Sequence, residues 1–275
     1  MDRFSNDTGA SVSGTRLAGK VAIVTGAGHE GEVLGTGAAI SILFAAQGAS
    51  VGLVDVSPQR AANTEALISR AGGRCAIVIG DVSVQADCSR AVAEVADRFG
   101  SLDVLVNNAG VVGRGSVEEV DETHWDQVFD VNVKGVLLMS RFAIPLMRRG
   151  GGGSIVNVSS IAAIRGFGSP SYAASKGGVL ALTTDMAYSY GRSGIRVNCI
   201  VPGHLYTPMG NTGGSELREA RRKCGLLGTE GTAWDVAWAA LFLACEESRW
   251  ITAVALPVDA GTTAATALAM RSLVS

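Results

Sequence analysis

The sequence predicts an α/β fold in which one doubly wound parallel sheet of about seven strands carries helices on both faces. Three observations lead to this class. Short runs rich in β-branched residues alternate with longer stretches of helical character. The expected strands are nearly all apolar, as is typical of parallel strands that are buried on both faces. A glycine-rich turn follows the first strand and opens into an apolar helix.

The expected elements follow one another without a linker, charge block or internal repeat that would divide the chain. We therefore expect one domain over residues 17–261, a flexible N-terminal tail over 1–16 and a C-terminal tail over 262–275 that packs on a neighbouring subunit. The expected strands cover residues 21–24, 51–54, 75–79, 104–106, 154–158, 196–200 and 255–258. The expected helices cover residues 37–47, 59–71, 84–99, a long stretch near 125–148 and the segment that carries Tyr172.

Composition and charge exclude several classes of protein. The 275 residues are 47% hydrophobic and 17% charged, with a formal net charge of −2, so no basic surface for nucleic acid is indicated. No apolar run approaches the roughly 18 residues that span a bilayer. The five cysteines form no C-x-x-C pair, which argues for reduced thiols and against a metal site. The first sixteen residues lack the features of a secretory or organellar signal, so we expect a cytoplasmic protein.

The turn after the first strand is the expected site for the pyrophosphate of a dinucleotide. Gly26 and Gly28 lie in the turn, and Gly35, Thr36 and Gly37 lead into the helix. Glycines let the backbone approach phosphate oxygens closely, and the helix N-terminus offers free N–H groups and the positive end of the helix dipole.

Asp55, at the end of the second expected strand, indicates which dinucleotide is bound. Its carboxylate can accept hydrogen bonds from the ribose hydroxyls of adenosine and would repel an added 2′-phosphate, which favours NAD over NADP. The alternative is a solvated strand end, or a cap for the helix that follows Pro58.

Tyr172-x-x-x-Lys176 is the motif that carries the chemistry. A phenol has a pKa near 10 and is a poor base at neutral pH unless a nearby ammonium stabilises the phenolate. Residues four apart share one helix face, with side-chain carbons roughly 5 to 6 Å apart, so we expect Lys176 to lower the pKa of Tyr172. The pattern predicts proton transfer at an alcohol or carbonyl, although the motif alone also occurs on solvated helices.

With these motifs in this order, the chain resembles the short-chain dehydrogenase/reductase family from about Leu17 to Gly261. The resemblance implies a Rossmann-type fold. The matching motifs are Thr25-Gly26 with Gly35-x-Gly37, Asp81-Val82, Asn107-Asn108-Ala109-Gly110, Asn132, Ser159-Ser160, Tyr172-x-x-x-Lys176, Pro202-Gly203 with Thr207, and Val258-Asp259-Ala260-Gly261.

The resemblance also implies roles for these residues. Tyr172 would be the acid/base, Lys176 would lower its pKa and hold the nicotinamide ribose, Ser160 would position the substrate oxygen, and Asn132 would anchor a water in a proton relay. The cofactor-binding residues implied by the family are Asp81 and Val82 at the adenine, Asn108, Ala109 and Gly110 along the cofactor, and Pro202, Gly203 and Thr207 around the nicotinamide.

The chain departs from the family pattern at two places. The family spacing to Tyr172 favours Ser159, whereas the 28 residues from Asn132 and the run Ser160-Ile-Ala favour Ser160, which we prefer. A one-residue deletion within residues 164–171 would explain the difference.

The second departure is a longer glycine turn, which indicates an insertion between Gly28 and Gly35. The alternative fingerprint Gly26-x-Gly28-x-x-Gly31 would leave Gly35 and Gly37 inside the helix, each at a cost of up to about 1 kcal/mol. The insertion carries His29, Glu30 and Glu32, which would either contact the adenosine side of the cofactor or belong to a solvated loop.

The sequence therefore predicts an NAD-dependent oxidoreductase that interconverts a secondary alcohol and a ketone. The alternatives are a non-redox enzyme of the same fold, such as a dehydratase or epimerase, and a nucleotide-sensing protein. We expect a substrate lid around residues 204–232, in which four cationic side chains could attract an anionic substrate or belong to a solvated helix face, and His204 as a possible second proton donor. The resemblance implies a homotetramer or a homodimer.

Overall fold

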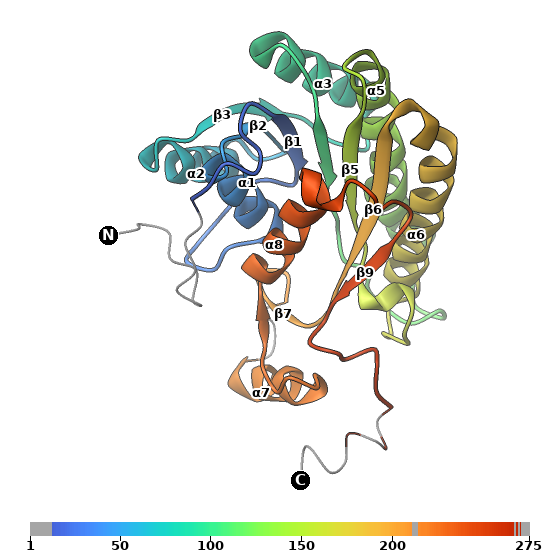
Figure 1. Cartoon of the computed structure of the whole chain (residues 1–275). Helices are drawn as coiled ribbons and strands as arrows, with labels where there is room; N and C mark the ends of the chain where they lie inside the picture. The colour runs from blue at the N-terminus through green and yellow to red at the C-terminus, as the bar shows by residue number, and fades with distance from the viewer. Residues whose placement is uncertain (1–12, 211–213, 267, 269, 271–275) are drawn as a thin grey trace.

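The structure, a computed structural model, describes residues 13–210, 214–266, 268 and 270. Seven strands form one parallel sheet in the order β3-β2-β1-β4-β5-β6-β9 (Figure 1), which confirms the expected doubly wound α/β fold. The strands are β1 (Val21–Thr25), β2 (Ser50–Asp55), β3 (Arg74–Ile79), β4 (Val104–Asn107), β5 (Gly153–Val158), β6 (Ile195–Pro202) and β9 (Ala255–Val258).

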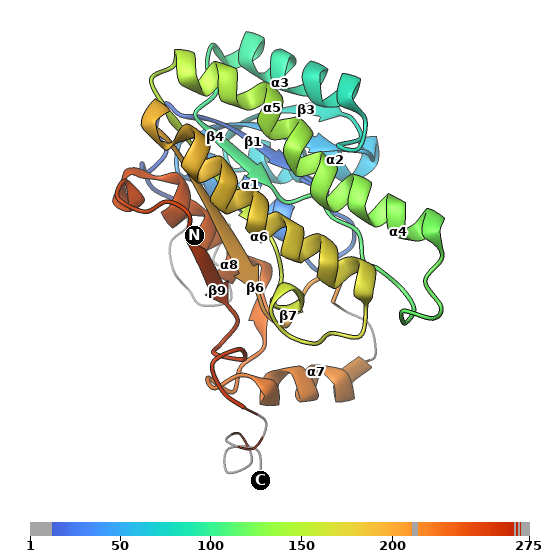
Figure 2. The same cartoon turned by 90° about the vertical axis from the view of Figure 1, so that its right-hand side faces the viewer.

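Helices cover both faces of this sheet. One face carries α1, α2 and α8, and the other carries α3, α5 and α6, which lie toward the viewer in Figure 2. The helices are α1 (Thr36–Ala46), α2 (Pro58–Arg70), α3 (Gln85–Phe99), α4 (Glu122–Phe129), α5 (Gly135–Arg149), α6 (Pro170–Tyr190), α7 (Gly214–Cys224) and α8 (Ala233–Ala244).

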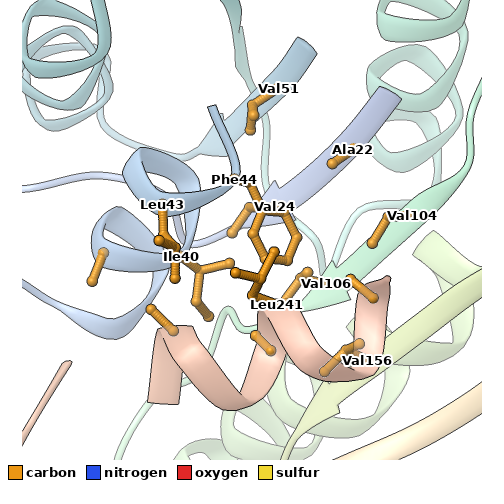
Figure 3. Packing of buried hydrophobic residues seen from close by; sticks show 14 of the residues in the cluster. Ala22, Val24, Ile40, Leu43, Phe44, Val51, Val104, Val106, Val156 and Leu241 are labelled. Atoms are coloured by element: carbon orange, nitrogen blue, oxygen red, sulfur yellow. The ribbon is translucent and has the colours of Figure 1, made fainter. Parts of the chain in front are cut away.

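The apolar strands bury alternate residues in two separate cores. Ile23 of β1 belongs to the core under α3, α5 and α6, whereas the next residue, Val24, belongs to the core under α1 and α8. Figure 3 shows Phe44 of α1 and Leu241 of α8 meeting over the sheet in this second core. Burial of one such side chain stabilises the fold by about 1.5 to 3 kcal/mol, so the cluster holds α1, and with it the glycine turn, against the sheet.

The strand order reverses between β1 and β4, because the chain runs outward through β2 and β3 and then returns to the other side of β1. In open α/β sheets, ligands bind beyond the carboxyl ends of the strands at such a reversal. The glycine turn after β1 and the loop after β4 both lie there.

Four of the described elements that were not expected from the sequence are α8, β7, β8 and a π-helical turn. Helix α8 was missed because its sequence, AWDVAWAALFLA, is apolar nearly all round and lacks a clear amphipathic pattern. Two-residue strands β7 (Leu205–Tyr206) and β8 (Gly231–Thr232) pair outside the main sheet. The long helix expected near residues 125–148 is interrupted by a π-helical turn, Asp130–Lys134, between α4 and α5.

The expected tails and lid fall partly outside the described residues, namely at 1–12, 211–213, 267, 269 and 271–275. Contact with the domain begins before residue 17, because the N–H of Gly14 donates to the carbonyl of Ala46 at 3.1 Å. Among the described helices, none combines the length and the apolar character needed to cross a membrane.

Candidate active site

A tight glycine cradle forms where β1 meets the start of α1. Gly26 has a φ of +63°, a left-handed conformation that favours glycine. A methyl group on Gly37 would lie 2.1 Å from the Gly26 carbonyl oxygen and 2.5 Å from Asn108 Nδ2, so no side chain fits there. Gly35 is the N-cap of α1 and its side has open space, since a methyl group there would meet nothing within 4 Å.

Helix α1 therefore begins at Thr36. This start agrees with an insertion between Gly28 and Gly35. It does not agree with the alternative fingerprint Gly26-x-Gly28-x-x-Gly31, which would leave Gly35 inside the helix. No side-chain hydrogen bond caps the helix. The first N–H groups of a helix have no intrahelical acceptor, and together with the helix dipole they attract an anion. The cradle thus fits the pyrophosphate of a dinucleotide.

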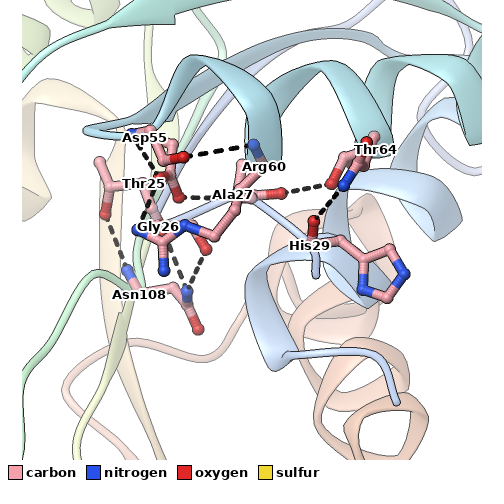
Figure 4. A network of polar contacts seen from close by, with 11 residues as sticks. Thr25, Gly26, Ala27, His29, Asp55, Arg60, Thr64 and Asn108 are labelled. Atoms are coloured by element: carbon pink, nitrogen blue, oxygen red, sulfur yellow. Dashed lines mark hydrogen bonds and ion pairs between the residues drawn. The ribbon is translucent and has the colours of Figure 1, made fainter. Parts of the chain in front are cut away.

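Asn108, at the carboxyl end of β4, forms hydrogen bonds to this cradle from the other side (Figure 4). Its Nδ2 donates to the Thr25 carbonyl at 2.9 Å, and its Oδ1 accepts from Thr36 Oγ1 at 2.6 Å. The Thr25 hydroxyl oxygen accepts the N–H of Ala109 at 3.0 Å. These bonds tie the ends of β1 and β4 to the first residue of α1, so the backbone faces of three segments converge.

Asp55 ends β2 beside the same turn, with its side chain only 6% exposed. Its carboxylate accepts the N–H of Gly28 at 2.8 Å and that of Ser57 at 2.9 Å, and lies 3.2 Å from Arg60 Nη2 of α2 (Figure 4). Four lone-pair directions are available on a carboxylate, so three such donors leave capacity for a ribose hydroxyl. The contact with Arg60 was not expected, since an arginine five residues after the strand end carries no recognisable signal.

The inserted loop docks on α2 rather than projecting over the cradle. The N–H of His29 donates to the Arg60 carbonyl at 2.9 Å, and Asn63 Nδ2 donates to the His29 carbonyl at 2.9 Å (Figure 4). Partial burial lowers the pKa of His29. Glu30 and Glu32 are exposed, so their charges are solvated.

Tyr172 and Lys176 lie one turn apart near the start of α6 and are both buried, 8% and 4% exposed. Lys176 Nζ lies 5.7 Å from the centre of the Tyr172 ring and donates to the Val158 carbonyl, at the end of β5, at 3.0 Å. The predicted sharing of one helix face is therefore present.

The expected lowering of the tyrosine pKa by Lys176 is not what the structure gives. Burial raises the pKa of Tyr172, and the hydrogen bond from Ser160 opposes this rise. Burial also lowers the pKa of Lys176 to about 8. The ammonium is directed to the Val158 carbonyl rather than to the phenol, and desolvation is the larger influence on the pKa of Tyr172.

The two adjacent serines face different partners. The Ser160 side chain lowers the pKa of Tyr172, and its hydroxyl oxygen accepts the N–H of Ala162 at 3.2 Å. The Ser159 hydroxyl is turned away and donates to the Lys176 carbonyl at 2.7 Å, 3% exposed. Of the two, only Ser160 has its hydroxyl beside the phenol.

Asn132 lies in the π-helical turn and joins the loop after β4 to α6. Its Oδ1 accepts the N–H of Val111 at 2.8 Å, and its Nδ2 donates to Ser175 Oγ at 3.0 Å. A methyl group on Gly110 would lie 3.2 Å from Asn132 Oδ1 and 3.3 Å from Lys176 Nζ. Both polar groups thus reach the glycine that continues the Asn108 segment.

The remaining expected residues lie at the same carboxyl edge of the sheet. The carboxylate of Asp81 accepts the N–H of Ser83 at 2.8 Å, and Val82 is buried. Pro202 ends β6, and the N–H of Gly203 donates to the Val258 carbonyl at 2.9 Å. The hydroxyl of Thr207 accepts the N–H of Gly210 at 3.3 Å.

A parallel sheet with a dinucleotide cradle at its strand reversal and a Ser-Tyr-Lys group beside it defines a Rossmann-type oxidoreductase. Comparison with known proteins agrees with this class. The sequence profile of a family described as Enoyl-(Acyl carrier protein) reductase matches residues 32–263. Levodione reductase from Leifsonia aquatica is 34% identical over 270 residues, which cover 94% of this chain and 99% of that protein.

Two further comparisons extend over the same part of the chain. An uncharacterized oxidoreductase from Thermotoga maritima is 37% identical over 253 residues, which cover 90% of this chain and 98% of that one. A crystal structure of levodione reductase matches with a TM-score of 0.86 at 32% identity, covering 91% of this chain and all 100% of the other. The chain belongs to the short-chain dehydrogenase/reductase family, whose members bind a nicotinamide dinucleotide, and the expected family is thereby confirmed.

Proposed function

We propose that the protein is an NAD-dependent oxidoreductase that interconverts a secondary alcohol and a ketone, with Tyr172 as the acid/base. The observation that carries this proposal is that buried Tyr172 lies between Lys176, whose Nζ is near its ring and near Gly110, and Ser160, whose side chain lowers its pKa. A hydroxyl, a phenol and an ammonium thus lie together at the carboxyl edge of the sheet.

In the proposed reaction, Tyr172 gives its phenolic proton to the substrate oxygen during reduction and takes it back during oxidation. Ser160 holds the same oxygen through its hydroxyl, which orients the carbonyl toward the phenol. When bound, the nicotinamide supplies or accepts the hydride. Protein side chains thus donate and accept the transferred proton, and the reaction requires no metal.

Lys176 and Asn132 have supporting roles in this proposal. Lys176 would hold the nicotinamide ribose, and its charge would stabilise the phenolate once the cofactor and substrate have replaced water around the pair. Asn132 would anchor a water between Lys176 and solvent, so that the phenol can be reprotonated. The position of both groups around Gly110 supports these roles.

The preference for NAD is supported by Asp55. A ribose hydroxyl can donate to its free lone pairs, whereas a 2′-phosphate would meet a buried carboxylate. Arg60, already paired with Asp55, is a cation that a 2′-phosphate could use. The Asp55→Ser variant would release Arg60 and shift preference toward NADP.

We further propose a cytoplasmic homotetramer, or a homodimer, with a substrate lid around residues 204–232. The surroundings of Tyr172 are partly apolar, because the Phe167 and Tyr172 rings lie at a centroid distance of 5.9 Å. This favours small-molecule ketones with some apolar surface.

The test is cofactor oxidation, followed by absorbance, with a panel of ketones and with NADH and NADPH in parallel. We expect turnover that is faster with NADH, and loss of that preference in Asp55→Ser. A faster rate with NADPH in the wild type would contradict the role of Asp55. Tight binding of NADH without turnover of any ketone would favour the nucleotide-sensing alternative.

A further inference from the structure

Helix α7 is attached to the molecule in an unusual way. It lies beyond the carboxyl ends of β6 and β9, apart from the two layers of the fold (Figures 1 and 2). Among its residues in the described part of the chain, Arg221 is the one that is buried, 8% exposed. A surface helix normally buries an apolar stripe, and charged side chains are rarely buried unless they are paired.

Arg221 is paired on one side only. Its Nε donates to Glu230 Oε1 at 2.7 Å, and Glu230 is itself 8% exposed. The other carboxylate oxygen of Glu230 accepts from Arg218 Nε at 2.8 Å. Arg221 Nη2 is buried and has no hydrogen-bond partner among the described residues. A buried guanidinium with one unused arm calls for a further acceptor.

A second carboxylate, which acts on His204 together with Arg221, is already used. Asp259, directly after β9, accepts the N–H groups of Gly261 and Thr263 and the Thr263 hydroxyl, at 2.6 to 2.9 Å. The Asp259 carboxylate is therefore occupied by hydrogen bonds within its own turn. The two arginines thus share a single buried carboxylate, that of Glu230.

The position of this cluster links it to the substrate side of the active site. Glu230 directly precedes β8, and β8 pairs with β7, which directly follows His204. A methyl group on Gly231 would lie 3.7 Å from the His204 carbonyl oxygen. His204 in turn follows Pro202 and Gly203 at the end of β6. Burial lowers the pKa of His204, and the positive charge of Arg221 lowers it further, which places the guanidinium within electrostatic reach of the imidazole.

We propose that Arg221 is a specificity-determining residue whose free Nη2 binds an anionic group of the substrate, so that the substrate class is a ketone or secondary alcohol that carries a carboxylate. This inference rests on the proposed function. A guanidinium fork held by Glu230 through Nε presents its other arm in a fixed direction, which suits a carboxylate oxygen.

The test compares two ketones of equal chain length, 4-oxopentanoate and the neutral 2-pentanone. Their binding is measured by calorimetry in the presence of oxidised cofactor, which cannot reduce a ketone, so binding is read without turnover. We expect 4-oxopentanoate to bind at least about tenfold more tightly, the range of a charge-assisted hydrogen bond. Equal binding of the two ketones, or no binding of 4-oxopentanoate, would overturn the inference.

The matched variants are Arg221→Met and Arg222→Met. Arg222 lies one residue further along α7, is 48% exposed and is paired with Glu219, so its removal changes the net charge equally without touching the buried site. The preference for 4-oxopentanoate should disappear in Arg221→Met and persist in Arg222→Met. Its survival in Arg221→Met would contradict the assignment.

A third variant tests the inference even if the Arg221→Met protein does not fold. Glu230→Gln keeps an oxygen that can accept from Arg221 Nε but removes the negative charge that repels an anionic substrate, so 4-oxopentanoate should bind several-fold more tightly while binding of 2-pentanone is unchanged. A purely structural arginine would not produce this gain, and its absence would count against the inference.

Turnover of the same two ketones with reduced cofactor separates this inference from the proposed function. Reduction of both at equal kcat/KM would overturn the anion site and leave the oxidoreductase activity in place. Preferential binding of 4-oxopentanoate without reduction of either ketone would leave the anion site in place and contradict the proposed activity.

Discussion

The Ser160 side chain lowers the pKa of the Tyr172 phenol, although the two residues belong to different elements. Ser160 follows β5 and caps a short 3-10 helix, whereas Tyr172 lies in the first turn of α6. The neighbouring Ser159 binds the Lys176 carbonyl instead. The two serines therefore allow function and folding to be separated by single substitutions.

Ser160→Ala should lower kcat/KM for a ketone substrate by about 100-fold, because the substrate oxygen loses a positioned donor. Ser159→Ala should leave kcat/KM nearly unchanged and lower the free energy of unfolding by about 1 kcal/mol, the usual worth of one hydrogen bond. Steady-state kinetics and urea unfolding of both variants check this. The reverse pattern would assign the substrate contact to Ser159.

Gly35 and Gly37, at the start of α1, should also separate function from folding, because substitution of Gly37 affects stability and substitution of Gly35 affects binding of NADH. Gly37→Ala should lower the free energy of unfolding by about 3 kcal/mol, since a methyl group 2.1 Å from a backbone oxygen cannot be accommodated by a side-chain movement. Gly35→Ala should change it by no more than about 1 kcal/mol.

Gly35→Ala should nevertheless weaken binding of NADH at least about tenfold, because its methyl group would fill the space that the pyrophosphate is proposed to occupy. Urea unfolding and calorimetric titration with NADH measure the two effects. Unchanged NADH affinity in Gly35→Ala would place the phosphates elsewhere.

The buried Lys176 should make stability depend on alkaline pH. Its pKa is about 8 in the folded protein against 10.5 for an ordinary lysine. Below both values the ammonium is protonated in both states, and the cost of burying its charge is fully present. Between them the unfolded chain retains the proton that the folded protein has lost, so the free energy of unfolding rises with pH.

The measurement compares wild type with Lys176→Met at about pH 7 and about pH 10. The wild type should gain on the order of 1 to 3 kcal/mol relative to the variant at the higher pH. A constant difference between the two proteins would mean that Lys176 keeps an ordinary pKa.

Two alanines occupy positions that favour glycine. Ala253 and Ala260 have φ values of +63° and +53°, in the left-handed region. Ala253→Gly and Ala260→Gly should each raise the free energy of unfolding by up to about 1 kcal/mol, because glycine adopts this conformation without a steric cost. Ala66→Gly, on the exposed face of α2, should instead lower it by about 1 kcal/mol. Thermal unfolding of the three variants checks the sign of each change.

These two alanines also illustrate what the sequence could not predict, because an alanine does not by itself indicate a left-handed backbone conformation. The seven strands were predicted to within about two residues of their observed ends, because buried parallel strands leave continuous apolar runs. Helix α8 was missed since its apolar sequence has neither a polar face nor a strand-like length.

The candidate site was predicted as a set of residues but not as a geometry. The sequence spacing placed Tyr172 and Lys176 on one helix face. Spacing cannot show which acceptor the Lys176 ammonium binds, and in the structure it donates to the Val158 carbonyl. The choice between Ser159 and Ser160 needed the local backbone after β5. The docking of the inserted loop on α2 and the pairing of Arg60 with Asp55 depend on long-range contacts that no local pattern encodes.

The proposed reaction depends most directly on Tyr172 as the group that exchanges a proton with the substrate. The measurement is kcat for reduction of the best ketone of the panel by wild type and by Tyr172→Phe, with calorimetric binding of NADH to both. We predict that kcat falls by about 100-fold to 10,000-fold while the NADH dissociation constant stays within about threefold. A Tyr172→Phe protein that keeps kcat within about tenfold of wild type would contradict the mechanism.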